Sequence, residues 1–409
     1  MLRMGILWAR FRKALPTIVL AILGTYILSR LGILHGLERL VADAEVAASP
    51  QRSEEIRVVN ITNDDYEKIF SGFPVAVHPE KLHDLIDAIA RSKPRVISVD
   101  IDTSHPSFKA FKVDPSWPTV IWERDLATQD IQHEPHNEAE IEPTDVLGGQ
   151  DPKLNLHSGI PQLLDDPEDK ITRLYTHCVE TKAGALPSLV HAVATAYRTA
   201  KAGGEARGER LCAEGGAAAH AEQLYFIRYS LRLDSSLTQT SAAQVMGRSG
   251  KREGGGQELP IDDFEGKVVL LGGTYRDFDR HGTPIGELPG IVVLANAIQT
   301  ELGGKPVKAL SRGWLFALEL LSSTGLVVLF TLFPVSPVKL FAYGLAVSAA
   351  MSFGLSYLSF DTLSRFASFA PTLLAVLVFE IYEHMRHESI VEGMESGSKA
   401  GHGGHRIKP

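Results

Sequence analysis

Short apolar runs alternate with amphipathic segments through the middle of the chain. Runs rich in β-branched and aromatic residues are typical of buried strands. They occupy residues 56–61, 94–101, 119–123, 171–180, 223–230 and 267–272. Apolar residues spaced three or four apart are typical of helices, and they occupy 79–92, 186–200, 241–247 and 290–304. Because strands that alternate with helices usually join a sheet in parallel, the pattern predicts an α/β domain with a partly parallel sheet.

Longer apolar runs lie toward both ends of the chain. Each of them is long enough, or nearly so, to cross a hydrocarbon core of ~30 Å. They cover residues 14–34, 313–333, 338–358 and 364–383. The sequence therefore predicts four transmembrane helices, one before the α/β domain and three after it. A cleaved signal peptide at the first run is the alternative interpretation.

Basic residues determine the predicted orientation of these helices. The basic residues before the first run are Arg3, Arg10, Arg12 and Lys13. Because positive charge stays on the cytoplasmic side, residues 1–13 and the Gly-rich, disordered tail 384–409 are predicted to be cytoplasmic. Residues 35–312 are then an extracytoplasmic domain of a multi-pass protein of the inner (plasma) membrane, periplasmic in a Gram-negative cell.

Composition narrows the partners and the cofactors. The mean hydropathy of +0.01 averages a polar middle and apolar ends. The formal net charge is -8 and no Lys/Arg-rich tract is present, so we expect no nucleic acid as a partner. The apolar runs make a lipid membrane the expected partner. Cys178 and Cys212 lack the spacing of a zinc site, and they are either two free thiols or an extracytoplasmic disulfide. We expect no cofactor.

Polar residues gather where three of the predicted strands end. Ligands of open α/β sheets bind beyond the carboxyl ends of the strands, so these residues form the candidate ligand-binding site if the strands are parallel neighbours. The candidate residues are Asn60, Asn63, Asp100, Asp102, Arg276, Asp277, Asp279 and His281. Because neither a G-x-S-x-G nor an S-x-x-K motif lies between a strand and a helix, we expect no catalytic residue and no enzymatic activity.

Three hypotheses for the loop 272–284 remain open. It lacks both glycine patterns of nucleotide-binding loops, which sets phosphate binding aside. A small-molecule pocket could pair Arg276 and Asp279 with a polar ligand. Alternatively, Asp277 or Asp279 accepts bonds from its own loop, with Arg280 as an ion partner.

The third hypothesis for this loop is a divalent metal site. Four carboxylates would then supply the oxygen ligands, namely those of Asp100, Asp102, Asp277 and Asp279. A further carboxylate, Glu319, falls inside the second apolar run. It is a candidate for coupling between transmembrane helices, or it reaches the membrane interface.

Several stretches of the chain resemble the CHASE2 family of bacterial extracytoplasmic sensory domains. They are "PRVISVDID" (94–102), "DDPEDKITRLYTHCVE" (165–180) with "LPSLVHAVA" (186–194), "YFIRYSL" (225–231), and "FEGKVVLLGGTYRDFDRHGTPIGELPGIVVLANAIQTEL" (264–302). The resemblance covers residues 50 to about 385. The chain departs from the family pattern in two places. Asn60-Ile61-Thr62-Asn63 stands in place of an acidic cluster, and Leu294 stands where the family usually has histidine.

The resemblance implies a sensor, and it also suggests a partner. In relatives a cytoplasmic kinase or cyclase often follows the last helix, and we expect no such module in the short tail 384–409. We therefore expect a separate protein to supply the output, and the chain itself to be a sensor or accessory protein that signals through its transmembrane helices. The alternative is a scaffold subunit of an envelope complex that uses the same fold for interaction. A homo-oligomer is compatible with both.

Overall fold

The computed structural model describes most of the middle of the chain. The described residues are 35–48, 55–70, 77–125, 142–149, 157–182, 184–204, 212, 224–229, 239–249, 264–275, 279–303 and 306–309, with isolated positions in 16–31 and 313–366. One compact unit comprises Val46–Lys308, and a second comprises Met1–Glu45 with Ala309–Pro409. Helix α2 (His35–Ala48) begins in the second unit, which also contains β15 (Arg365–Phe366).

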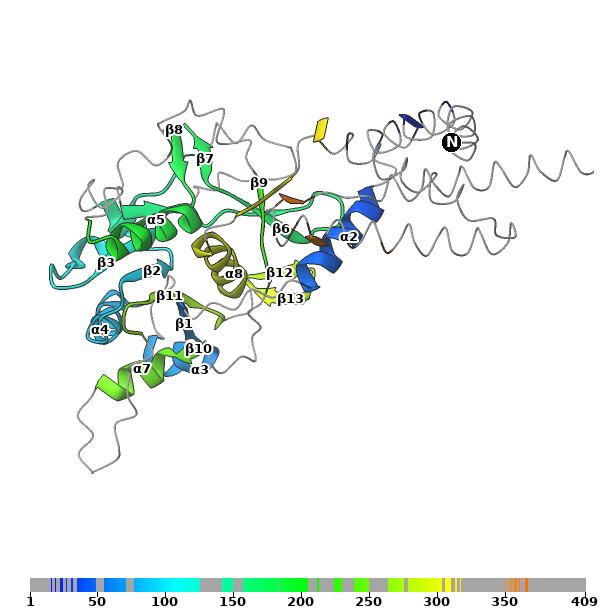
Figure 1. Cartoon of the computed structure of the whole chain (residues 1–409). Coiled ribbons are helices and arrows are strands. Elements are labelled where there is room, and N and C mark those ends of the chain that lie inside the picture. Colours follow the sequence, from blue (N-terminus) through cyan, green and yellow to red (C-terminus); the bar gives the residue numbers. More distant parts are fainter. Residues whose placement is uncertain are drawn as a thin grey trace, which may run out of the picture. The chain divides into compact units, whose positions relative to one another are not determined.

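A parallel sheet forms the centre of the Val46–Lys308 unit (Figure 1). Its strand order is β10-β1-β11-β2-β3-β4, and every neighbouring pair is parallel. The strands are β1 (Ile56–Ile61), β2 (Val96–Asp100), β3 (Thr119–Glu123), β4 (Ser158–Gly159), β10 (Gln239–Ser241) and β11 (Val268–Gly273). The prediction of an α/β domain with a partly parallel sheet is therefore confirmed.

Helices cover both faces of this sheet. One face buries Val59, Val99 and Leu271 against α4 (Pro79–Ala90) and α7 (Ala242–Ser249). The other face packs against α5 (Leu189–Lys201) and α8 (Gly290–Leu302). All six residues of β1 are buried, as expected for a central strand that is covered on both sides.

Antiparallel strands and hairpins flank the parallel sheet. Strands β5 (Leu163–Asp165), β6 (Thr172–Thr176), β9 (Leu224–Phe226) and β14 (Val307–Ala309) pair in the order β14-β9-β6-β5. The hairpins are β7 (Cys178–Thr181) with β8 (Gly184–Pro187), and β12 (Arg280–Thr283) with β13 (Gly286–Pro289). Shorter helices are α3 (Asn63–Asp65), η1 (Tyr66–Phe70), η2 (Pro106–Ala110) and η4 (Val146–Gly149).

The predicted strand at 171–180 is broken in two at His177. Residues 172–176 form β6 of one sheet, and residues 178–181 form β7 of another. The break has a tertiary cause, because the His177 carbonyl accepts a hydrogen bond from the Ser188 amide at 2.8 Å. The His177 ring stacks on Tyr225 with a centroid distance of 4.0 Å. The His177 backbone therefore pairs beside β8, next to the Cys178–Pro187 pair, and no longer with the sheet of β6.

One part of the predicted fold class is wrong. Within the described residues no helix is both long and apolar enough to cross a membrane, whereas the sequence pattern predicted four such helices. The predicted runs at 14–34, 313–333, 338–358 and 364–383 lie outside the described residues except at isolated positions. Helix α2, the longest described helix, has 14 residues, and at 1.5 Å per residue it is too short to span ~30 Å.

A disulfide joins Cys178 to Cys212, with 5.9 Å between the two Cα atoms. The sequence alone had left this pairing open. The bond links the first residue of β7 to a residue 34 positions further along the chain. Structural disulfides persist mainly in oxidising compartments outside the cytoplasm, which agrees with an extracytoplasmic domain.

Candidate functional site at the carboxyl edge of the parallel sheet

Polar residues occupy the last positions of adjacent parallel strands. Asn60 of β1 is in register with Gly272 of β11, which is in register with Asp100 of β2. Glu123 ends β3, one residue after Trp122, which pairs with Val99. Three strands that the sequence had singled out therefore do end side by side at one edge of the sheet.

This row of residues lies on the face that α8 covers. Side chains alternate between the faces of a strand, and Val59, Val99 and Leu271 belong to the core on the opposite face. A Cβ atom at Gly272 would lie 2.7 Å from Cδ1 of Ile291 in α8. Glycine at position 272 therefore allows the first turn of α8 to approach the sheet beside Asp100.

The hairpin β12–β13 carries two further groups to the same edge. His281 Nε2 lies 3.0 Å from Asp279 Oδ1, and His281 Nδ1 lies 3.4 Å from Asp165 Oδ1. The same Nδ1 atom lies 3.2 Å from the hydroxyl of Thr172. We call Asp100, Glu123, Asp279 and His281 together the carboxylate edge.

Burial and mutual repulsion change the acidity of the carboxylate edge. Burial, followed by the charge of Asp279, raises the pKa of Asp100 to about 7, although His281 opposes this increase. Burial, followed by the charge of Asp100, also raises the pKa of Glu123 well above its ordinary value. The hydrogen bond to Asp279 raises the pKa of His281. The carboxyl group of Asp100 therefore changes its protonation state near neutral pH.

Asp279 also contacts the start of α8. Its carbonyl accepts a hydrogen bond of 2.9 Å from the Gly290 amide. Its carboxylate occupies the space that a Cβ atom on Gly290 would need. A negative charge at the first turn of a helix is favourable because unpaired amides and the helix dipole point toward it. Arg280 pairs with Glu287 at 3.3 Å, and the ion partner of Asp279 is His281.

The other predicted site residues are placed as follows. Asp102 Oδ1 accepts the Ser104 amide at 2.8 Å, so its carboxylate caps its own turn. Asn63 begins the short helix α3. The side chain of Asn60 is 8% exposed, and its Oδ1 has no hydrogen-bond partner among the described residues. Three further predicted residues lie outside the described part of the chain, namely Arg276, Asp277 and Glu319.

Sequence reasoning missed two members of this neighbourhood, Glu123 and Asp165. Both end a strand, and strand-end position was the signal used for Asp100. Glu123 could have been found in this way because β3 was predicted correctly. Asp165 could not, because its contact with His281 spans 116 positions of the sequence.

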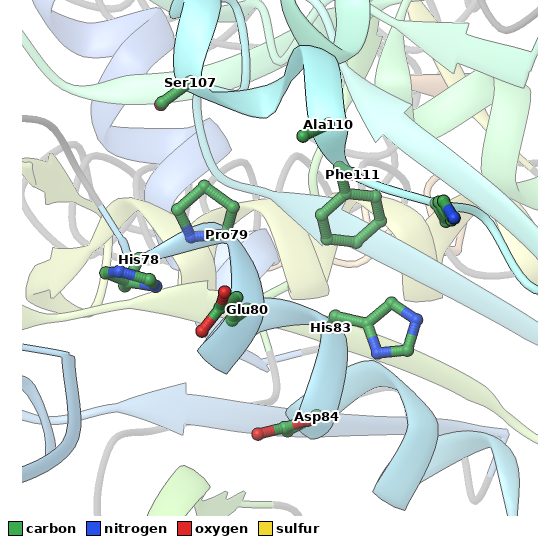
Figure 2. Close-up of a pocket in the computed structure, with 9 residues that line it drawn as sticks. His78, Pro79, Glu80, His83, Asp84, Ser107, Ala110 and Phe111 are labelled. Atoms are coloured by element: carbon green, nitrogen blue, oxygen red, sulfur yellow. The ribbon is translucent and has the colours of Figure 1, made fainter.

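A concavity lies at the start of α4 (Figure 2). Its lining includes acidic, basic and aromatic side chains. They are His78, Glu80, His83, Asp84, Phe111 and Lys112, with Pro79, Ser107 and Ala110. This mixture favours no single ligand chemistry, so the carboxylate edge remains the candidate site.

The fold and the edge together define a three-layer α/β domain with ionisable groups where such domains bind ligands. The family model for the CHASE2 domain matches residues 17–333, and the chain therefore belongs to the CHASE2 family. CHASE2 domains are extracytoplasmic sensory domains. Comparisons with curated proteins and with solved structures found no match.

Proposed function

We propose that this CHASE2 protein senses a small cationic or hydrogen-bond-donating molecule outside the cytoplasm and passes the signal to a separate partner protein. The supporting observation is the carboxylate edge. Burial raises the pKa of Asp100 to about 7 and that of Glu123 well above its ordinary value, and Asp279, whose charge adds to both shifts, is paired with His281. A bound cation would lower these pKa values, because an opposite charge nearby favours the ionised form of a carboxyl group.

The route from the edge to the partner begins at α8. Hairpin β12–β13 leads directly into α8, and Asp279 contacts its first residue, Gly290. A ligand that draws Asp279 or His281 toward Asp100 would therefore pull on the start of this helix. Helix α8 is followed by β14, close to the end of the unit at Lys308. Location at the inner membrane belongs to this proposal, and cell fractionation of the full-length chain checks it.

The proposal is for a binding protein without catalytic activity, and it needs a partner to be tested. The full-length chain would be crosslinked in its native cells, purified and analysed by mass spectrometry, beside an Asp100→Asn variant. We expect one protein in near-stoichiometric amount, with a yield that differs between the two forms. A chain that purifies alone, and whose deletion leaves cellular signalling unchanged, would exclude the sensor.

A second candidate function is a scaffold subunit of an envelope complex. It is favoured by one observation, which is that Asp279 and His281 already have internal partners in Gly290, Asp165 and Thr172. In that case the edge stabilises its own loop and binds nothing. The scaffold predicts that Asp279→Asn changes thermal stability but leaves both the partner yield and the signalling output as in the wild type.

A further inference from the structure

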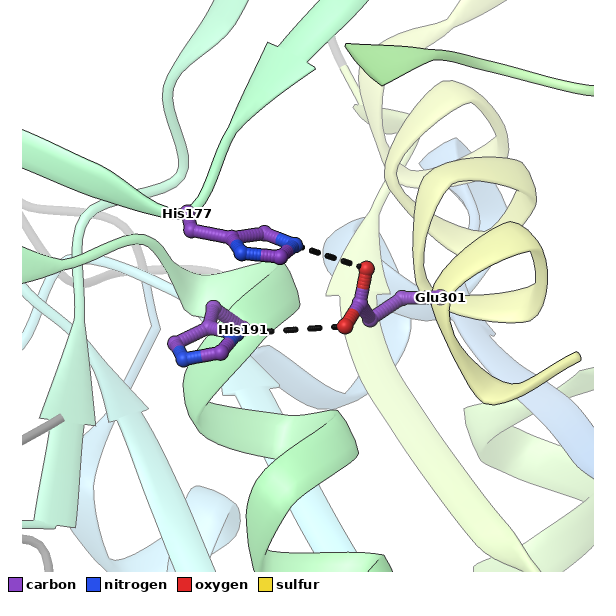
Figure 3. A group of neighbouring side chains, drawn as sticks. All are labelled: His177, His191 and Glu301. Carbon is purple, nitrogen blue, oxygen red and sulfur yellow. Dashed lines mark hydrogen bonds and ion pairs between the residues drawn. The ribbon is translucent and has the colours of Figure 1, made fainter. Parts of the chain in front are cut away.

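Two histidines and a glutamate meet on the α5–α8 side of the domain, away from the carboxylate edge (Figure 3). His177 lies at the bend between β6 and β7, His191 lies in the first turn of α5, and Glu301 lies in the last turn of α8. His177 Nε2 is 2.9 Å from Glu301 Oε2, and His191 Nδ1 is 3.9 Å from Glu301 Oε1. One such atom from each residue lies within 4.8 Å of the other two.

The three side chains are held in place by their surroundings. The His177 ring stacks between His191, at a centroid distance of 4.3 Å, and Tyr225, at 4.0 Å. The next residue along the chain, Cys178, is fixed by its disulfide. Ser188 caps α5 by accepting the amide of His191 at 3.2 Å. The cluster is therefore preorganised by contacts that do not depend on its own polar atoms.

Glu301 is buried, with a side chain 2% exposed. Besides the two histidines, Glu301 has two polar neighbours. Tyr175 donates its hydroxyl to Oε2 at 2.8 Å, and Arg198 Nη1 lies 3.3 Å from Oε1. Burial alone would raise the pKa of Glu301, but its hydrogen bonds, those of the histidines and Tyr175 among them, outweigh burial and lower it. Both carboxylate oxygens of the buried Glu301 side chain therefore have polar partners.

We propose that His177, His191 and Glu301 form a binding site for a divalent transition-metal cation of the zinc class. Two imidazoles and one carboxylate are a donor set that Zn²⁺ accepts, with a fourth position left to water. Ligand atoms at ~2.0–2.1 Å from zinc in a tetrahedron lie roughly 3.4 Å apart, and the observed separations of 2.9 and 3.9 Å lie on either side of that value. The His177 and His191 rings are stacked with only 19° between their planes, so one ring must rotate out of the stack for both to direct a nitrogen at one ion.

The alternative is a buried ion pair between Arg198 and Glu301 that has no ligand. Arg198 is the group that would compete with a cation. Its side chain is 43% exposed, but Nη2 also donates to the Glu301 carbonyl, so Arg198 breaks two contacts when it turns toward solvent as the ion enters. Tyr175, in contrast, donates its hydroxyl to Oε2, the oxygen that His177 also contacts, and a carboxylate can keep such a hydrogen bond when it holds a metal ion. In the ion-pair interpretation Arg198 neutralises Glu301, whereas in the metal-site interpretation the cation displaces Arg198.

Zinc binding can be measured on the purified full-length chain without a polyhistidine tag. The parent for all variants carries His402→Gln and His405→Gln, because these tail histidines could bind the ion weakly. After treatment with EDTA, ZnCl₂ is added in a calorimeter, and CoCl₂ is added in a spectrophotometer. We expect one Zn²⁺ per chain and visible Co²⁺ absorption bands typical of nitrogen and oxygen ligands in tetrahedral geometry.

Variants decide between the metal site and the ion pair. His191→Gln and Glu301→Gln should each weaken Zn²⁺ binding by about 10-fold to 100-fold or more and remove the Co²⁺ bands. Arg198→Gln should preserve binding or tighten it. The control His83→Gln, on α4 across the sheet, should behave as the parent. Absence of saturable Zn²⁺ binding in the parent, or equal binding in parent and His191→Gln, would overturn the proposal.

Discussion

At the scale of the residue, a carboxyl group in this protein is defined by what it contacts. Asp100 and Asp102 are two positions apart and both partly buried, yet the charges of Asp279 and Asp125 act on Asp100, whereas Asp102 accepts its own turn amide. The two side chains therefore have different roles although the sequence treats them alike. Substitution of Asp100 therefore tests the effect of charge on stability, and substitution of Asp102 tests the effect of the turn.

We expect Asp100→Asn to stabilise the fold at pH 8 but not at pH 4. The pKa of Asp100 is about 7 in the folded protein, above its ordinary value of 3.8, so its protonated form favours folding. That contribution is complete below pH 3.8 and is lost as the pH rises through about 7. Thermal unfolding at pH 4, 6 and 8 should show a variant advantage that grows to about 1–3 kcal/mol.

The control for this experiment is Asp102→Asn. An asparagine oxygen can still accept the Ser104 amide, and the charge of Asp102 adds to the repulsion at Glu123 less than that of Asp100, so this variant should show a smaller advantage at pH 8 than Asp100→Asn. An advantage of Asp100→Asn that is constant from pH 4 to pH 8 would contradict the electrostatic explanation.

The second prediction at the scale of the residue concerns Gly290. A methyl group at Gly290 would overlap the carboxylate of Asp279, so Gly290→Ala should destabilise the fold by about 1–3 kcal/mol. Asp279→Ala removes the obstacle, and the double variant should then lose less stability than the two single losses combined. Additive losses in a urea-unfolding cycle would show that Gly290 is needed for another reason.

At the scale of the element, the disulfide replaces hydrogen-bond pairing where the strand 171–180 breaks. Strand β7 leaves the β6 sheet at His177 and pairs only with β8 among the described strands. A two-stranded hairpin is marginal without further support. The Cys178–Cys212 bond closes a loop with a sequence separation of 34 and supplies that support.

Removal of this bond should lower the free energy of unfolding by about 4 kcal/mol, from the chain entropy of a loop of that length. The double variant Cys178→Ser/Cys212→Ser and the wild type are compared by urea unfolding, with and without dithiothreitol. We expect the reductant to bring the wild type to the level of the variant and to leave the variant unchanged. A variant as stable as the oxidised wild type would show that the hairpin is stable by itself.

At the scale of the whole molecule, the parallel sheet and its helices could be predicted because their signals are local. The apolar runs of β1, β2, β3 and β11 and the amphipathic pattern of α4 needed no tertiary information. The hairpin β12–β13 was missed because Thr283 and Gly286 flank Pro284-Ile285, which is not a typical hairpin turn pair.

Long-range contacts explain what else escaped sequence reasoning. The carboxylate edge was found only in part, since the contact between His281 and Asp165 depends on how distant strands pack. The group formed by His177, His191 and Glu301 spans 124 positions between its first and last members and has no motif spacing. The transmembrane prediction used apolar length alone, and no described helix supports it.

Helix α8 connects the two sites, and this leads to the last prediction. Its first residue contacts Asp279 of the carboxylate edge, and Glu301 in its last turn joins the two histidines. Every residue from Gly290 to Glu301 is buried, so the helix should open as one cooperative unit. His281→Gln at one end and His177→Gln at the other should therefore accelerate hydrogen exchange along residues 293–302 as a whole. Amides of α4, across the sheet, are the control and should keep their protection. If each variant changed only the nearer turn of α8, the two sites would be independent, and a ligand at the edge could not be felt at the histidine cluster.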